Sequence, residues 1–246
     1  MQLIEMRDRM NFFANAWDSD LAWSFRQAPL VMAAALMTTV IVLAAVLAPL
    51  IAPHDPFNPA TLNLMDGFTP PMTPNAMSGQ VYLLGTDNQG RDILSTILYG
   101  ARISLFVGFS AVLFAMALGI FVGLVAAWRG GWIDSTLMRV ADIQLSFPSI
   151  LIALLIFGVA RSLIPVAYRE QMAIWVLIVA IGLSDWVQFA RVVRGAALVE
   201  KSKEYVQAAQ AIGVRPSRIV LTHILPNVMG PVLVIATIGL ALAIIA

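Results

Sequence analysis

The chain has 246 residues, of which 60% are hydrophobic and 12% charged, so its composition lies outside the range of a soluble domain and indicates a membrane protein. Its formal net charge of +1 comes from scattered basic residues, which argues against nucleic-acid binding. There is no cysteine, and the only two histidines, His54 and His223, lie in different segments, so we expect no metal site and no cofactor.

Five apolar runs are long enough to cross a bilayer, whose hydrocarbon core of about 30 Å needs about 20 helical residues. They are 29–52, 103–127, a less regular run from Asp134 to Ala160, 172–190 and 228–246. Pro148 interrupts the third run and should kink it. The predicted fold class is therefore an all-α polytopic membrane protein with five spans.

Basic residues predict the orientation of these spans, because cytoplasmic segments carry an excess of Lys and Arg. One side would hold Arg7, Arg9, Arg26, Arg129, Arg139, Arg191, Arg194, Lys201, Lys203, Arg215 and Arg218, and the other Arg91, Arg102, Arg161 and Arg169. The first side is predicted to be cytoplasmic. Segment 1–28 would then be a cytoplasmic N-terminal segment, residues 29–246 would form the transmembrane domain, and the proline-rich loop 53–90 would lie outside.

The external loop leads into a second predicted helix. We expect little regular structure among its prolines, then a helix-start signal at Thr86 and Asp87. An apolar stripe follows at Ile93, Leu94, Ile97, Leu98 and Ala101, which predicts a helix in the outer interface that turns into the second span. Arg91 and Asp92 are interpreted as a solvated pair or a helix cap rather than a substrate contact.

Small residues recur every four positions in the second span, at Ala111, Ala115, Gly119 and Gly123. This spacing lets transmembrane helices pack backbone to backbone, so we expect packing here rather than the lining of a pore.

A polar, helix-patterned hairpin lies between the fourth and fifth spans, at 204–228. One helix face is predicted at Tyr205, Ala208, Ala209 and Ile212, which have the spacing i, i+3, i+4 and i+7. Because two of these residues are alanines, another protein surface could approach this face closely. Gly213 stands where a helix cap belongs, and Pro216 suits the start of a second short helix that Pro226 should end. That helix would carry Ile219, Val220, Leu221, Ile224 and Leu225.

The hairpin resembles the EAA loop of the membrane subunits of ABC importers. The matching residues are QAAQAIG at 207–213 and the Leu225-Pro226 pair, and Gln207 replaces the usual acidic residue. The start at Glu204, the HILPN ending at 223–227 and the GTD-x-x-GRD wording before the second span resemble the dipeptide, oligopeptide and nickel permeases. The resemblance implies a type I importer fold and an ATPase-coupling loop at 200–227 made by Glu204, Tyr205, Gln207, Ala208, Ala209, Ile212, Gly213, His223, Leu225 and Pro226.

The resemblance also implies partners and a substrate. We expect a second homologous permease subunit, two ATP-binding subunits, an external solute-binding protein and surrounding membrane lipid, in a bacterial cytoplasmic (inner) membrane. The transported solute would be a di- or oligopeptide or a peptide-like molecule, carried through residues for which no motif is present. Relatives have a sixth span, so we expect the native product to continue past Ala246.

No nucleotide-binding P-loop and no common hydrolase motif occurs, so ATP hydrolysis is expected on partner subunits and no catalysis on this chain. Two acids remain to be explained. Asp185 is predicted to hydrogen-bond to Gln188, and Asp142 to pair with Arg139. The alternatives are a secondary transporter that couples ions through Asp185, and an intramembrane hydrolase that uses Asp142 and Asp185. His223 is interpreted as a helix-end donor rather than a ligand.

Overall fold

The computed structural model describes residues 20–58, 62, 64–75 and 78–245. It consists of two compact units, Met1–Arg102 and Ile103–Ala246. Most of the predicted segment 1–28, with Arg7 and Arg9, lies outside the described residues, as does Ala246.

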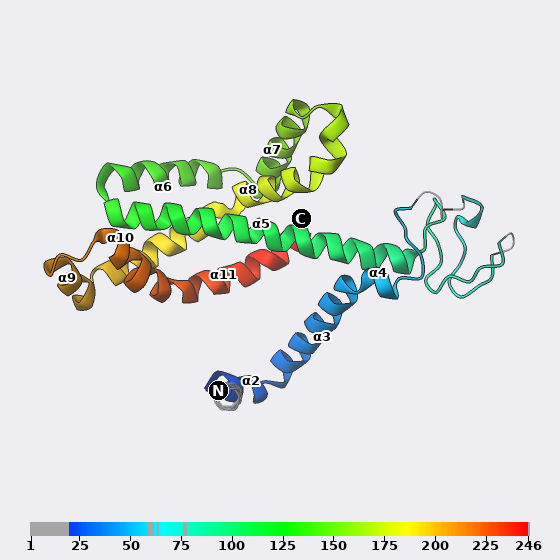
Figure 1. The fold of residues 1–246 in the computed structure, drawn as a ribbon, viewed down its shortest axis with the longest axis horizontal. Helices are drawn as coiled ribbons and strands as arrows, with labels where there is room; N and C mark the ends of the chain where they lie inside the picture. Colours follow the sequence, from blue (N-terminus) through cyan, green and yellow to red (C-terminus); the bar gives the residue numbers. More distant parts are fainter. Residues whose placement is uncertain (1–19, 59–61, 63, 76–77, 246) are drawn as a thin grey trace, which may run out of the picture. The chain divides into compact units, whose positions relative to one another are not determined.

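Helices account for the regular structure (Figure 1). Within the described ranges there is no strand, only two isolated bridges, Pro74 to Val81 and Thr86 to Asp92, so the predicted all-α class is confirmed. The helices are α2 (Asp20–Arg26), α3 (Pro29–Val46), α4 (Ala48–Ile51), η2 (Leu64–Asp66), α5 (Ile93–Arg129), α6 (Gly131–Leu145), α7 (Ser149–Leu163), η3 (Val166–Tyr168), α8 (Arg169–Lys201), α9 (Glu204–Ala211), α10 (Pro216–Ile219), η4 (Val220–Ile224) and α11 (Leu225–Ile245).

Four helical stretches in the described chain are long and apolar enough to cross a membrane: Pro29–Val46, Ile93–Arg129, Val166–Lys201 and Pro216–Ile245. A fifth arises if α6 and α7 together form one span. These two helices meet at 94°, with Pro148 directly before α7, so the predicted kink is confirmed and is much sharper than expected. The pair is either a broken span or a re-entrant loop.

The loop 53–90 of the first unit, predicted to be external, has a polar interior. Its described residues form one short 3₁₀ turn, η2, and the two bridges, as expected for a proline-rich segment. Asp66, Thr69 and Thr86 are buried, and they bond to one another through side chains and backbone. The loop therefore has a defined conformation without regular secondary structure, because buried polar groups must be hydrogen-bonded.

The helix after this loop starts later than predicted and does not turn. Asp92, rather than Thr86 or Asp87, caps α5: its Oδ2 accepts a 3.0 Å hydrogen bond from the backbone N–H of Ser95. The cap interpretation of Asp92 is thus confirmed, while Arg91 pairs with Asp87 at 2.7 Å. From Ile93 to Arg129, α5 is unbroken, so the separate interfacial helix is wrong. Its 37 residues span about 55 Å, well beyond the hydrocarbon core.

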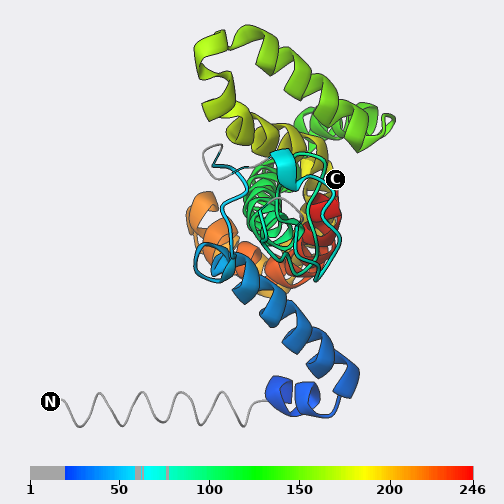
Figure 2. The ribbon, with the colours of Figure 1, turned by 90° about the vertical axis from the view of Figure 1, so that its right-hand side faces the viewer.

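In the second unit, α5, α8 and α11 pack around one apolar core. Figure 2 views α5 nearly end-on with α11 beside it. Gly119 and Gly123 of α5 lie directly against α8: an added Cβ at Gly119 would stand 2.4 Å from Phe189 Cβ, and one at Gly123 would stand 2.6 Å from the Ala190 carbonyl oxygen. Ala111 and Ala115 are fully buried in this core. The four small residues therefore serve helix packing, as predicted.

Candidate functional site

The predicted coupling hairpin joins α8 to α11 at one end of the second unit (Figure 1). It consists of α9, a four-residue loop, α10 and η4. Gly213 has a φ of +80°, its N–H donates to the Gln210 carbonyl at 3.0 Å, and the Val214 N–H donates to the Ala209 carbonyl at 3.0 Å. These two hydrogen bonds form a Schellman cap, so the predicted helix end at Gly213 is confirmed. Pro216 begins α10, also as predicted.

One face of α9 packs into the protein's own core. Val206 is fully buried and Ala209 is 7% exposed, and both join the apolar cluster that contains Ile219, Ile224 and Val228. The prediction that Ala209 lies on the outer face with Ala208 is therefore wrong. Val206 and Ala209, three residues apart, lie on the inner face of α9. Their packing in the core holds the hairpin against the transmembrane helices.

The opposite face of α9 is open. Glu204, Gln207, Ala208 and Ala211 follow one another at i, i+3, i+4 and i+7, and all are exposed. Ile212, at the C-cap, is 80% exposed, an unusual position for a large apolar side chain. We call these five residues the α9 outer face. It is a small, shallow surface with an acidic start and an apolar end.

A network of polar side chains clamps the base of the hairpin. Glu200, at the end of α8, binds Lys203 Nζ through Oε1 at 2.6 Å and the Tyr205 hydroxyl through Oε2. Asn227 Nδ2 donates to the Tyr205 hydroxyl at 3.0 Å and to the His223 carbonyl at 2.7 Å. The hydrogen bond to Glu200 raises the pKa of Lys203 and that of Tyr205. The clamp thus joins α9 to two long helices, α8 and α11.

Glu200 and Asn227 were not among the predicted site residues. The carboxylate of Glu200 lies one turn before the hairpin, in a helix whose end the sequence does not mark. The ring Nδ1 of His223 lies 2.8 Å from Thr222 Oγ1 in the last turn of η4. Its interpretation as a helix-end donor stays a prediction.

Pro226 does not end a helix. It is the second residue of α11, which follows η4 without a break, and η4 is a π-helical turn. Proline lacks an N–H and its ring crowds the preceding turn, and a wider π turn relieves both conflicts. The second half of the hairpin is thus rigidly continuous with the last span.

Lys201 joins the hairpin base to α5. Its Nζ donates to the carbonyl oxygens of Ala127 and Trp128 at 3.1 and 2.9 Å. Carbonyl groups in the last turn of a helix lack a partner within that helix, so the ammonium group satisfies them. The same Nζ lies 5.3 Å from the centre of the Trp128 ring. Three long helices therefore meet at this end of the unit.

The two acids differ from the predictions. Asp142 of α6 pairs with Arg191 of α8, not with Arg139. No hydrogen bond joins Asp185 to Gln188, and the neighbouring Ser184 hydroxyl donates to the Ile181 carbonyl at 2.7 Å. Asp185 and Gln188 instead line a cavity of about 230 Å³ together with Ser149 of α7 and residues of α5 and α11. Within the described chain, no cation pairs with Asp185.

The comparisons with known proteins agree with this architecture. Residues 115–246 match the family described as the inner membrane component of binding-protein-dependent transport systems, and residues 15–71 match the N-terminal transmembrane domain of oligopeptide transport permease C. The chain belongs to this family of inner membrane permease components, and it is a multi-pass membrane protein.

Several relatives are peptide permeases. The oligopeptide transport system permease protein of Bacillus subtilis is 34% identical over 92% of this chain and 67% of its own length. The dipeptide transport system permease protein of Alkalihalophilus pseudofirmus is 42% identical over 65% of this chain and 50% of its own. That of Haemophilus influenzae is 34% identical over 84% and 65%. The chain thus spans between half and about two thirds of the length of these relatives.

Proposed function

We propose that this chain is a membrane subunit of an ATP-driven importer of di- or oligopeptides, and that the α9 outer face docks on a cytoplasmic ATPase subunit. The observation that carries the proposal is the construction of the hairpin. Its inner face, Schellman turn and polar clamp hold it rigidly on α5, α8 and α11, while its outer face is left open. The names of the relatives supply the substrate class.

The assembly would contain a second homologous permease subunit, two ATP-binding subunits, which carry out the hydrolysis, and an external solute-binding protein. This chain would have no catalytic role. Closure of the ATPases would displace α9, and the clamp at Glu200, Tyr205 and Asn227 would convert that displacement into rocking of α8 and α11. Residues 29–246 would form the transmembrane domain, with segment 1–28 and the coupling loop 200–227 in the cytoplasm and loop 53–90 outside.

The orientation can be tested with reporter fusions. A reporter that is active only in the cytoplasm should be active after Lys203 and inactive after Asn75. The reverse pattern would place α9 where no ATPase can reach it, and the proposed coupling would be wrong.

The docking face can be tested with two single-residue variants. Ala208→Glu adds a carboxylate to the centre of the outer face, whereas Gln210→Glu adds one on an exposed flank of the same helix. We expect Ala208→Glu to abolish co-purification of the ATPase and peptide uptake while membrane insertion stays normal, and Gln210→Glu to retain both. Equal ATPase binding by the two variants would make the hairpin a simple connector.

The cavity beside Asp185 favours a second candidate, an ion-coupled transporter. The two candidates differ in their energy source. In vesicles loaded with ATP and the ATPase subunits, the importer should take up peptide after the proton gradient is collapsed, and Asp185→Asn should leave that uptake driven by ATP. Uptake by this chain alone that needs a gradient and is lost in Asp185→Asn would support the alternative.

A further inference from the structure

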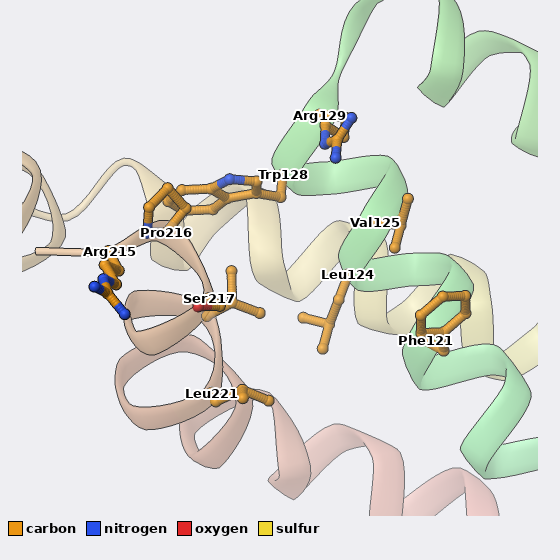
Figure 3. Close-up of a pocket in the computed structure, with 10 residues that line it drawn as sticks. Phe121, Leu124, Val125, Trp128, Arg129, Arg215, Pro216, Ser217 and Leu221 are labelled. Carbon is orange, nitrogen blue, oxygen red and sulfur yellow. The ribbon is translucent and has the colours of Figure 1, made fainter.

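A groove of about 700 Å³ lies beside the hairpin, between the last turns of α5 and the segment formed by α10 and η4 (Figure 3). Its lining residues are Phe121, Leu124, Val125, Trp128, Arg129, Arg215, Pro216, Ser217, Val220 and Leu221. None of the ten is acidic. The groove is separate from the α9 outer face and from the cavity at Asp185, and the proposed transport cycle uses none of its residues.

The groove changes character along α5. Arg129 is the last residue of α5, and Phe121 lies eight residues earlier, about 12 Å back along this candidate membrane span. The deep part is lined by Phe121, Leu124 and Leu221, and Phe121 and Leu221 are 67% and 60% exposed. The shallow part carries Arg129 and Arg215. One end of the groove, which we call its mouth, is thus cationic, and the rest of the groove is apolar.

The mouth has uncompensated positive charge. Neither guanidinium, that of Arg129 or that of Arg215, forms an ion pair with a residue that the structure describes. The ammonium group of Lys201, 5.3 Å from the Trp128 ring centre, adds a third cation nearby. In Figure 3, Trp128 reaches from α5 toward Pro216, with Arg129 and Arg215 on either side. Tryptophan is enriched at the level of lipid headgroups, so we expect this mouth at the membrane surface.

We infer that the groove binds one anionic phospholipid. Its phosphate would bind at the mouth that carries Arg129 and Arg215, and one acyl chain would run along Leu124, Leu221 and Phe121. Basic pockets beside transmembrane helices recognise anionic headgroups in this way. A lipid in this place bridges α5 and the hairpin, so the lipid composition would affect the stiffness of the coupling loop. Assignment to the cytoplasmic leaflet rests on the proposed orientation, whereas binding itself does not.

The test is native mass spectrometry of the purified protein in detergent, titrated with phosphatidylglycerol or with phosphatidylcholine of the same acyl chains. The variant is Arg129→Gln with Arg215→Gln, and the matched control is Arg218→Gln, an arginine on α10 that does not line the groove. Each arginine near an anionic surface contributes about five-fold in affinity. We therefore expect one tightly held phosphatidylglycerol in the wild type and in the control, and binding about 30-fold weaker in the double variant.

Equal retention of phosphatidylglycerol by the wild type and the double variant, or equal retention of phosphatidylcholine, would overturn the inference. A double variant that loses the ATPase subunit but keeps its lipid would assign the groove to a protein contact instead. Should the double variant not fold, phosphatidylglycerol with brominated acyl chains gives a second test. It should quench the tryptophan fluorescence of the wild type more than that of Trp128→Phe, and equal quenching would count against the site.

Discussion

Arg194 of α8 binds Asp134 of α6 through two parallel hydrogen bonds, from Nε to Oδ1 at 2.5 Å and from Nη2 to Oδ2 at 2.6 Å. The two residues are 60 positions apart in the sequence, and their pairing holds the start of α6 on α8, the helix that precedes the hairpin. Bidentate contacts of this kind fix both direction and distance between two helices.

Loss of this pair should destabilise the second unit. We expect Arg194→Ala to lower stability by about 1–2 kcal/mol, at the low end for a charged hydrogen bond because the Arg194 side chain is 34% exposed. Arg194→Lys should recover only part of the loss, since an ammonium cannot make both contacts. Thermal unfolding in detergent measures both values, and full recovery by lysine would reduce the pair to simple charge attraction.

The contact between α5 and α8 predicts a second effect. Gly119→Ala should be strongly destabilising, by about 1–3 kcal/mol or more, because the new Cβ would lie 2.4 Å from Phe189 Cβ and 2.7 Å from the Trp186 carbonyl oxygen. Gly158 of α7 has open space around it, so Gly158→Ala is the matched control and should be tolerated. Similar melting temperatures for the two variants would contradict the close packing.

The turn at Gly213 predicts the effect of a third substitution. A β-branched residue is strained at a φ of +80°, so Gly213→Val should cost about 1–3 kcal/mol and displace α10. Asparagine tolerates this conformation, and Gly213→Asn should be much milder. We expect the valine variant to hydrolyse ATP in the assembled importer without transporting peptide. Normal transport by Gly213→Val would show that the cap does not control coupling.

The sequence predicted the spans, the kink at Pro148 and the cap at Gly213, because apolar length, proline chemistry and positive φ are local properties. It failed where a choice between neighbours depends on tertiary contact. Ala208 and Ala209 fit one helix face equally well, and only the position of α9 over Ile219 and Ile224 turns Ala209 inward.

Long-range polar partners show the same limit. Arg139 was the nearest basic residue to Asp142 in sequence, yet the 94° bend brings α6 along α8, where Arg191 lies 49 positions away. Pro226 looked like a helix end because the π turn that accommodates it has no sequence signature. Glu200 and Asn227 were not predicted because contacts among three helices follow no regular spacing in the sequence.

Tyr82, in the loop 53–90, predicts a pH effect. Burial, followed by the 2.9 Å hydrogen bond to Asp66, raises the pKa of Tyr82 from 10.0 to about 12. The folded loop thus holds this proton more tightly than the unfolded chain, so its stabilising contribution is complete below pH 10 and is lost as the pH rises toward 12. A difference absorbance titration of the wild type against Tyr82→Phe should show one tyrosine that ionises near pH 12. Ionisation near pH 10 would mean that the hydroxyl is solvated.

The docking of the α9 outer face on an ATPase is tested most directly by cross-linking, for which the absence of cysteine gives a clean background. Ala208→Cys places a single thiol on the outer face, and Met72→Cys places one on an exposed residue of the loop 53–90, which is proposed to lie on the opposite side of the membrane. With a short thiol–amine cross-linker in membranes that contain the ATPase subunit, we predict a covalent adduct with the ATPase for Ala208→Cys and none for Met72→Cys. If Ala208→Cys reacts with a small maleimide but forms no more adduct than Met72→Cys, the hairpin is not the coupling surface.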